Sequence, residues 1–258
     1  MSGEKEIDWL YRVVFRLVRL FSPKFLVTGV ENLPGDPCVI VGNHSQMYGP
    51  IAAEIYTPVK HDIWCAAEMM NRKEVAAYAY QDFWSGKPRS VRWFYRLLSH
   101  MIGPLAELVF TNAHTVPVYH DMRIVSTFRE SVGKLQAGSS MVIFPEHYAE
   151  HNSIIHDFRD RFVDLAALYY RKTGRELCFV PMYLAPRLKL MIYGEPVCYR
   201  ADAPAEEERK RICRELMNRI TGIAVSLPEH TVVPYPNIPK RRYPKNTPLE
   251  TVSNEEES

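Results

Sequence analysis

The sequence predicts a single α/β domain with a mostly parallel central sheet flanked by helices, preceded by an amphipathic N-terminal helix. Short, continuous apolar runs alternate with stretches of helical periodicity, which is the pattern of buried parallel strands joined by crossover helices. The chain has 258 residues, of which 47% are hydrophobic and 24% charged, so it can bury the core that one such domain needs.

The first expected element is a basic amphipathic helix at residues 8–21. Arg12, Arg16 and Arg19 recur at helical spacing on one side, and apolar side chains cover the remainder. Such a helix can lie in a membrane interface with its arginines toward anionic headgroups, or it can pack on the core of its own protein. Both interpretations remain open at this point. Pro23 ends the helix.

Strands and helices alternate along the rest of the chain. The expected strands are residues 25–30, 38–41, 63–66, 116–119, 141–144, 178–184 and 188–193. The expected helices lie near 68–80, 91–109, 122–137, 159–171 and 204–226. The aromatic stretch 90–110 could face a membrane or line a lipid tunnel, but we expect a core helix that is interrupted at Gly103-Pro104.

This alternation divides the chain into three segments. Residues 1–22 form the amphipathic helix, 23–226 the α/β domain, and 227–258 a proline-rich strap that ends in a disordered acidic tail. No charge-free apolar run reaches the ~18 residues that a membrane-spanning helix needs. The charged N-terminus also shows no secretory signal.

Charge and cysteine content narrow the functional classes. A net charge of +2 is too small to indicate a nucleic-acid partner, and we expect none. The cysteines are odd in number, scattered, and lack a C-x-x-C pair; they are Cys38, Cys65, Cys178, Cys198 and Cys213. We therefore expect reduced thiols rather than a disulfide framework, in a cytoplasmic protein associated peripherally with the inner face of a membrane.

Ionisable residues follow directly after two of the expected buried strands. Asn43-His44 follows the strand 38–41, and Glu146 follows Phe144-Pro145 at the end of the strand 141–144. Ligand sites in open α/β sheets form where strands end. A histidine so placed can act as a general base, because its ordinary pKa of about 6.5 suits proton transfer at neutral pH. A structural histidine bonded to the main chain is the alternative interpretation of His44.

The order of motifs resembles that of the glycerolipid acyltransferase family, the 1-acylglycerol-3-phosphate acyltransferases. The matching segments are 27–34 (VTGVENLP), Asn43-His44, Val116-Pro117-Val118, 135–138 (LQAG), Phe144-Pro145-Glu146, Val180-Pro181-Met182 and 194–197 (GEPV). The resemblance covers roughly residues 20–200, and its specificity comes from several weak motifs in one order and spacing.

The resemblance implies an acyltransferase. In that family a histidine base, here His44, takes a proton from a hydroxyl of a lysophospholipid or another glycerolipid-like acceptor. The oxygen then attacks the thioester of acyl-CoA or acyl carrier protein. The resemblance further implies that Glu146 helps to bind the acceptor, that a membrane surface is a partner, and that no metal or cofactor is needed besides the acyl donor.

The chain departs from the family at the residue that orients the histidine. The family pattern N-H-x-x-x-x-D places Gly49 where the aspartate would stand. Glu54 is a poor substitute, because five positions further along a helix it faces elsewhere. Tyr48, a main-chain carbonyl or a carboxylate from another segment are the remaining candidates for orienting His44.

The phosphate-binding positions of the family are also altered. Phe-Pro-Glu continues as His147-Tyr148 rather than Gly-Thr-Arg, and His120 stands near the place of a second arginine, with Arg123 three residues on. We therefore expect His120, Arg123, His147 and Tyr148 to form a divergent headgroup site. The acceptor stays open between a phosphate-bearing lipid and a neutral or amine-bearing one.

Two alternatives belong to other functional classes. Gly49 favours a non-catalytic relative that binds lipid or acyl chains. The segment from His147 to His151, which contains Glu150, matches the H-x-x-E-H zinc signature of inverzincin peptidases and suggests a metallohydrolase. That second alternative requires a helix starting at Pro145, which would put both histidines on one face, and a third ligand such as Glu176 or Glu215.

Overall fold

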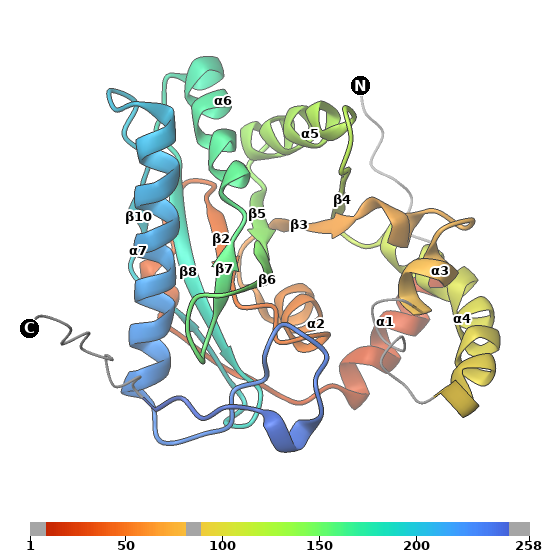
Figure 1. Cartoon of the computed structure of the whole chain (residues 1–258). Helices are drawn as coiled ribbons and strands as arrows, with labels where there is room; N and C mark the ends of the chain where they lie inside the picture. The colour runs from red at the N-terminus through yellow and green to blue at the C-terminus, as the bar shows by residue number, and fades with distance from the viewer. Residues whose placement is uncertain (1–8, 81–88, 248–258) are drawn as a thin grey trace, which may run out of the picture.

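The computed structural model describes residues 9–80 and 89–247, and it confirms the predicted fold class. One mostly parallel sheet forms the centre of the domain, with helices on its faces (Figure 1). The helices are α1 (Trp9–Phe21), α2 (Tyr48–Tyr56), α3 (Val75–Ala79), α4 (Arg92–Asn112), α5 (Ile124–Gln136), α6 (Asp164–Thr173) and α7 (Ala205–Ser226). The strands are β1 (Leu26–Thr28), β2 (Val39–Gly42), β3 (His61–Ala66), β4 (Thr115–Val118), β5 (Ser140–Ile143), β6 (Glu146–Glu150), β7 (His156–Phe158), β8 (Cys178–Ala185), β9 (Leu190–Tyr193) and β10 (Val197–Cys198).

The strand order in the sheet is β1-β9-β8-β2-β5-β3-β4, with β10 paired to β8. Neighbouring strands are parallel except where β9 and β10 pair with β8. A separate antiparallel pair, β6 and β7, follows β5. Every strand expected from the sequence is present, and all are short apolar runs that the sheet buries except β1, which is largely exposed.

The two central strands are buried on both faces. All residues of β2 and of β5 are buried, which explains why both sequences carry no charge. Val39 and Val41 pack in the cluster that includes residues of α5, α6 and α7, whereas Ile40 packs with Ala52 and Ala53 of α2. The alternation of side chains along β2 therefore divides the core between the two faces of the sheet.

Two helices differ from their expected form. Helix α2 has no amphipathic signature in the sequence and was not expected, but it covers the face of the sheet opposite α7. Helix α4 continues through Gly103-Pro104 instead of breaking there. Near the start of α4, Trp93, Phe94 and Leu97 are each at least 48% exposed, so this end of α4 is not a core helix.

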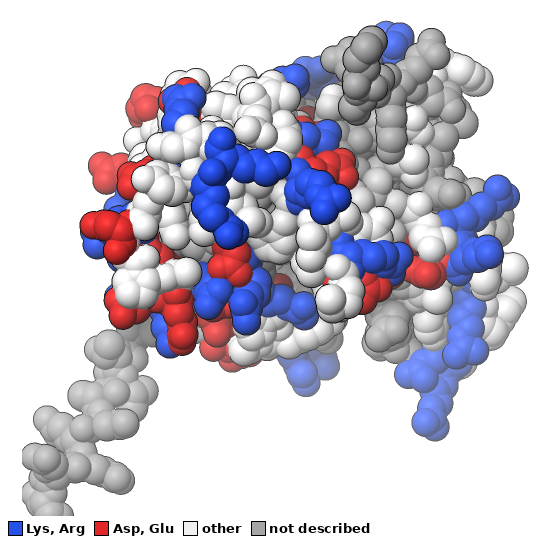
Figure 2. Space-filling view, turned by 90° about the horizontal axis from the view of Figure 1, so that it is seen from above, with Lys and Arg blue, Asp and Glu red and all other residues white. Residues whose placement is uncertain are grey.

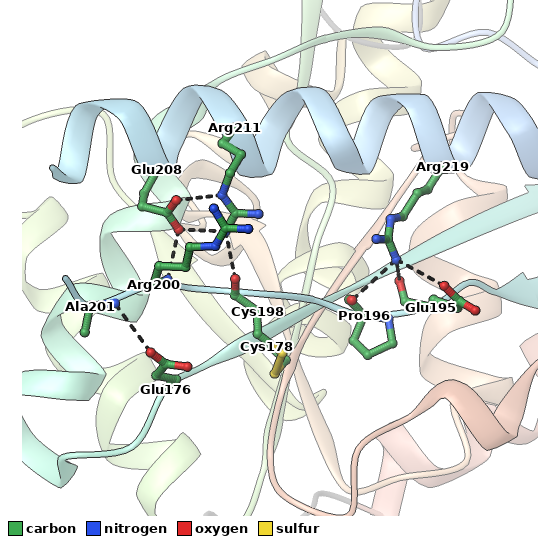
Figure 3. Close-up of a disulfide and its surroundings, with 10 residues drawn as sticks. All are labelled: Glu176, Cys178, Glu195, Pro196, Cys198, Arg200, Ala201, Glu208, Arg211 and Arg219. Atoms are coloured by element: carbon green, nitrogen blue, oxygen red, sulfur yellow. Dashed lines mark hydrogen bonds and ion pairs between the residues drawn. A yellow bond between two sulfur atoms is a disulfide. The ribbon is translucent and has the colours of Figure 1, made fainter. Parts of the chain in front are cut away.

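The expectation of five reduced thiols is wrong, because Cys178 and Cys198 form a disulfide. The antiparallel pairing of β8 and β10 places these two residues directly opposite each other, which their sequence separation of 20 does not reveal. Figure 3 shows that Arg211 of α7 donates a hydrogen bond to the carbonyl of Cys198 and pairs with Glu208. The disulfide and this arginine together attach β10 to β8 and α7.

Acidic and basic side chains are unevenly distributed over the surface. Acidic and basic side chains are intermingled over the left half of the face in Figure 2, whereas basic side chains predominate at its right edge. Among the described residues, no helix has the length and apolar character that crossing a membrane requires. The predicted acidic tail lies outside the described residues, whereas most of the proline-rich strap lies within them.

Candidate active site

The two motifs identified in the sequence lie side by side at one edge of the sheet. Strands β2 and β5 are parallel neighbours, with Val41 opposite Ile143, so their following residues leave the sheet together. The carboxylate of Glu146 accepts hydrogen bonds from the main-chain N–H of His44 (2.6 Å) and of His156 (2.9 Å). Glu146 thus connects the end of β2 to the antiparallel pair β6–β7.

Asn43 attaches the same turn to the other neighbour of β2. Its side-chain amide donates to the carbonyl of Leu184 (3.0 Å), and its carbonyl accepts from the N–H of Leu184 (2.7 Å). The amide also donates to the hydroxyl of Ser45 at 2.8 Å. The side chain of Asn43 therefore continues the hydrogen-bond ladder between β2 and β8 after the main chain has turned away. These bonds fix the position of the main chain at His44.

The turn after His44 is strained. Ser45 and Gln46 both have positive φ angles, 45° and 55°, a region that costs a non-glycine residue about 1–2 kcal/mol. The side chain of Gln46 donates to the hydroxyl of Tyr243 in the strap at 2.9 Å. The turn persists because its surroundings hold it, and backbone strain of this kind concentrates at functional sites.

Burial sets the protonation of Glu146. This side chain is only 6% exposed, and burial raises its pKa from 4.5 to about 7, although the two main-chain N–H donors oppose the shift. Both carboxylate oxygens already accept hydrogen bonds from the main chain. The bond to the main chain of His44 therefore holds that residue in place.

The imidazole of His44 lies between aromatic rings. Its centroid is 5.4 Å from that of Phe144 and 5.7 Å from that of Tyr235, both edge-on. Burial lowers the pKa of His44 from 6.5 to about 4, against a smaller opposing effect of the nearby main chain. The ring is therefore neutral at pH 7. Its Nδ1 is buried and has no hydrogen-bond partner among the residues that the structure describes.

The aspartate of the family pattern has no room at Gly49. A Cβ at this position would be in hard contact with the main-chain oxygen of His44, and 3.0 Å from Cε1 of Phe144. The close approach allows the N–H of Gly49 to donate to that oxygen at 3.0 Å. Glu54 lies elsewhere, as expected, and accepts a hydrogen bond from Tyr11 of α1.

The strap contributes a residue to the site that sequence reasoning missed. The ring of Tyr235 contacts those of His44, Tyr148 and His156, with centroids 5.5–5.9 Å apart. Buried residues on either side of Tyr235 fix the strap, including His230, which is hydrogen-bonded to Tyr183 at 2.8 Å. Nothing in the local sequence Pro-Tyr-Pro signals this role, because it depends on how the strap folds back.

The four expected headgroup residues do not form one cluster. His120 and Arg123 follow edge strand β4, three strand positions or about 14 Å from β2, and line a cavity of about 700 Å³. Arg123 pairs there with Asp121 at 2.8 Å and lies over the ring of Tyr119. His147 and Tyr148 instead belong to β6. Tyr148 is 73% exposed, and its ring contacts the ring of Tyr235, which in turn contacts His44.

The helix that the metallohydrolase alternative requires does not form. The segment that contains His147 and Glu150 is strand β6 rather than a helix, so residues four apart are separated by about 13 Å. Glu215 is occupied by ion pairs with Arg211 and Arg219. Within residues 9–80 and 89–247, no group of three His, Cys, Asp or Glu side chains could hold a metal ion.

Comparison with solved structures finds a distant similarity. The crystal structure of the 1-acyl-sn-glycerophosphate (LPA) acyltransferase PlsC from Thermotoga maritima aligns with a TM-score of 0.49 and 18% sequence identity. The alignment covers 88% of this chain and 86% of that chain. No protein-family model and no curated protein matches the sequence. The geometry of the site itself must therefore support any function.

Proposed function

We propose that the protein transfers a fatty acyl group from acyl-CoA or acyl carrier protein to a hydroxyl of a lysophospholipid or other glycerolipid-like acceptor. His44 is the general base. One observation carries the proposal: the carboxylate of Glu146 is bonded to the main chain of His44, which joins the Asn-His and Phe-Pro-Glu motifs into one site. Neither motif has this meaning alone, because each is a common tripeptide or dipeptide.

During the reaction one proton passes from the acceptor hydroxyl to His44 and then from His44 to the thiolate leaving group. Neutral His44 takes the proton from the acceptor hydroxyl while the hydroxyl oxygen attacks the thioester carbonyl. The carbon–sulfur bond breaks, the ester forms, and the thiolate leaving group receives the proton from the imidazolium. Burial destabilises the imidazolium, which makes His44 a weaker base in the first step and a stronger acid in the last one. No covalent acyl-enzyme is needed.

The test is release of free CoA from long-chain acyl-CoA in the presence of a panel of lysolipids and glycolipids. His44→Ala should lower the rate by about 10²–10⁴-fold, which is the usual contribution of a general base. His151→Ala is the matched control, because His151 is exposed and outside the site, and it should leave the rate unchanged. An equal rate in wild type and His44→Ala would exclude His44 as the base.

The pH dependence of acyl transfer follows from the burial of His44. A histidine base works when unprotonated, and the pKa of His44 is lowered to about 4. With an acceptor that does not titrate, such as a monoacylglycerol, kcat/KM should stay level down to about pH 5 and fall only toward pH 4. Circular dichroism over the same range shows whether the fold persists. An acidic limb near pH 6.5 would contradict this prediction.

A second candidate function is binding of lipid or acyl chains without catalysis. Within the described residues, Nδ1 of His44 has no hydrogen-bond partner and so no carboxylate that orients the base. This and the aromatic rings around His44 favour the alternative. Titration calorimetry with acyl-CoA distinguishes the two functions when combined with the release assay. Binding without release of CoA for any acceptor in the panel supports the second candidate. Release that depends on His44 excludes it.

A membrane surface, the lipid acceptor and the acyl donor are the partners in this proposal, with the protein attached peripherally to the cytoplasmic face. Support comes from α1, where Trp9, Leu20 and Phe21 are each at least 73% exposed. Apolar side chains so exposed on a basic helix are suited to insertion at a membrane interface.

A further inference from the structure

A second cavity, of about 570 Å³, lies beneath α1. Its walls come from α1, the end of α2, the start of β3 and the residue His114. Strand β3 begins at His61, which pairs with Ser140 at the start of β5, whereas Glu146 follows the end of β5. The cavity therefore lies at the amino-terminal ends of the strands, whereas His44 lies at their carboxyl ends. The proposed chemistry does not use this cavity.

Basic side chains dominate this cavity. Arg12, Arg16 and Arg19 of α1 line it together with Lys60, and Glu54 is the only carboxylate among the lining residues. Within the part of the chain that the structure describes, none of the four cations takes part in an ion pair. Four cations around one carboxylate give the cavity a positive potential that suits an anion such as a phosphate.

Two hydrogen-bond acceptors face each other inside the cavity. Oε2 of Glu54 and Nε2 of His61 lie 4.0 Å apart, and both are buried and without a hydrogen-bond partner in the described residues. Nδ1 of His61 is 2.8 Å from the carbonyl of Val59, so Nδ1 must be the donor, and Nε2 of the neutral ring carries a lone pair. A hydroxyl carries one hydrogen and can satisfy only one of these acceptors, so a ligand with two O–H donors, such as a diol, would satisfy both.

Helix α1 presents three faces. Tyr11 and Phe15 face the cavity and the protein, and Tyr11 donates to Glu54 at 3.1 Å. The arginines follow on the next face around the helix. Beyond them come the most exposed apolar residues of the helix, Trp9 (73%), Leu20 (73%) and Phe21 (81%). The cations therefore lie between the cavity and the surface that is suited to membrane insertion, from which long basic side chains can extend to charged headgroups.

We propose that this cavity binds the headgroup of an anionic phospholipid within a bilayer. The phosphate would meet Arg12, Arg16, Arg19 and Lys60. Two headgroup hydroxyls would each donate one hydrogen bond, one to Glu54 and the other to His61. Phosphatidylglycerol has both features, a single phosphate charge and a glycerol with free hydroxyls. The inference rests on the membrane association in the proposed function, and it is independent of acyl transfer.

Vesicle co-sedimentation without any acyl donor tests the phosphate part. Wild type should bind vesicles containing phosphatidylglycerol at least tenfold more tightly than vesicles of phosphatidylcholine alone. Arg16→Gln and Lys60→Gln should each weaken binding about fivefold, because one basic residue near an anionic surface contributes that much. Lys172→Gln on α6 is the matched control and should have no effect. An unchanged affinity for Lys60→Gln, or an equal loss for Lys172→Gln, would show diffuse attraction and overturn the site.

The hydroxyl part is tested with phosphatidylmethanol, which has the same charge but no headgroup hydroxyl. Wild type should prefer phosphatidylglycerol, and Glu54→Gln should abolish that preference, because the amide nitrogen cannot accept a hydrogen bond. Equal binding of the two lipids by wild type would overturn the role of Glu54 and His61 as acceptors for the headgroup hydroxyls. Circular dichroism verifies that Glu54→Gln is folded, and Lys60→Gln, at an exposed residue, keeps the test independent of that variant.

Vesicle binding and acyl transfer can be tested separately, so that the loss of one is distinguished from the loss of the other. His44→Ala should bind vesicles like wild type, because His44 lies at the opposite, carboxyl ends of the strands. Lys60→Gln should keep its rate of CoA release with a monoacylglycerol acceptor dispersed in detergent. Loss of vesicle binding in His44→Ala would contradict the separation of the two sites.

Discussion

Replacing Gly49 with aspartate is expected to destabilise the protein and not to produce a working His–Asp pair. A Cβ at position 49 would be in hard contact with the main-chain oxygen of His44, and the N–H of Gly49 already bonds that oxygen. Main-chain atoms on a strained turn cannot move aside cheaply, so the free energy of unfolding should fall by about 1–3 kcal/mol or more. Urea denaturation followed by circular dichroism measures the loss.

The controls for Gly49 separate steric conflict from helix propensity. Gly49→Ala should lose nearly as much stability as Gly49→Asp, because both add the same Cβ. Gly133→Ala is the matched control: Gly133 is also helical, but its Cβ would have no neighbour within 4 Å, so the change should stabilise by about 0.5–1 kcal/mol. Wild-type stability together with increased acyl transfer in Gly49→Asp would contradict the geometry.

Changes at Glu146 should disconnect the two motifs. Glu146→Gln keeps one acceptor oxygen and turns an amide nitrogen toward the other main-chain N–H, leaving that donor buried and unpaired. At pH 5 this should cost about 1–3 kcal/mol of stability, and Glu146→Ala, which leaves two unpaired donors, should cost more. Both variants should also lose acyl transfer, because the main chain of His44 is no longer held.

The pH dependence of stability provides an independent check on Glu146. Burial raises its pKa from 4.5 to about 7, so the folded protein keeps a proton that the unfolded chain has already lost. The stability from this group is fully present below about pH 4.5 and is lost as the pH rises toward 7. Glu146→Gln lacks this loss, so its deficit relative to wild type should be smaller at pH 8 than at pH 5. A constant deficit would contradict a raised pKa.

The neutral state of His44 shapes any catalytic mechanism. In a His–carboxylate pair the carboxylate stabilises the imidazolium, whereas here aromatic rings surround the ring and burial disfavours the charge. In the proposed reaction His44 is therefore a base that stays unprotonated over a wide pH range. This arrangement fits slow proton abstraction from a hydroxyl, and it equally fits an apolar wall for an acyl chain.

Local pattern in the sequence was enough to predict the sheet and the position of His44. Continuous apolar runs such as 38–41 and 141–144 form strands because only a doubly covered sheet buries them, and polar residues after such runs must emerge at the sheet edge. The same logic identified Glu146. The disulfide, helix α2 and strands β6 and β7 were not predicted, because each depends on which segments pack together rather than on periodicity.

Residue patterns were enough to predict the α/β fold and the basic helix at the N-terminus, and to show that glycine stands at position 49 in place of an aspartate. What surrounds His44 depends on tertiary packing: the main-chain bond to Glu146, the ring of Tyr235 from the strap, and an Nδ1 that has no partner in residues 9–80 and 89–247. The physical reason is that strand formation depends on residues next to one another in the chain. Protonation and hydrogen bonding at a site depend on residues brought together from segments as far apart as 44 and 235.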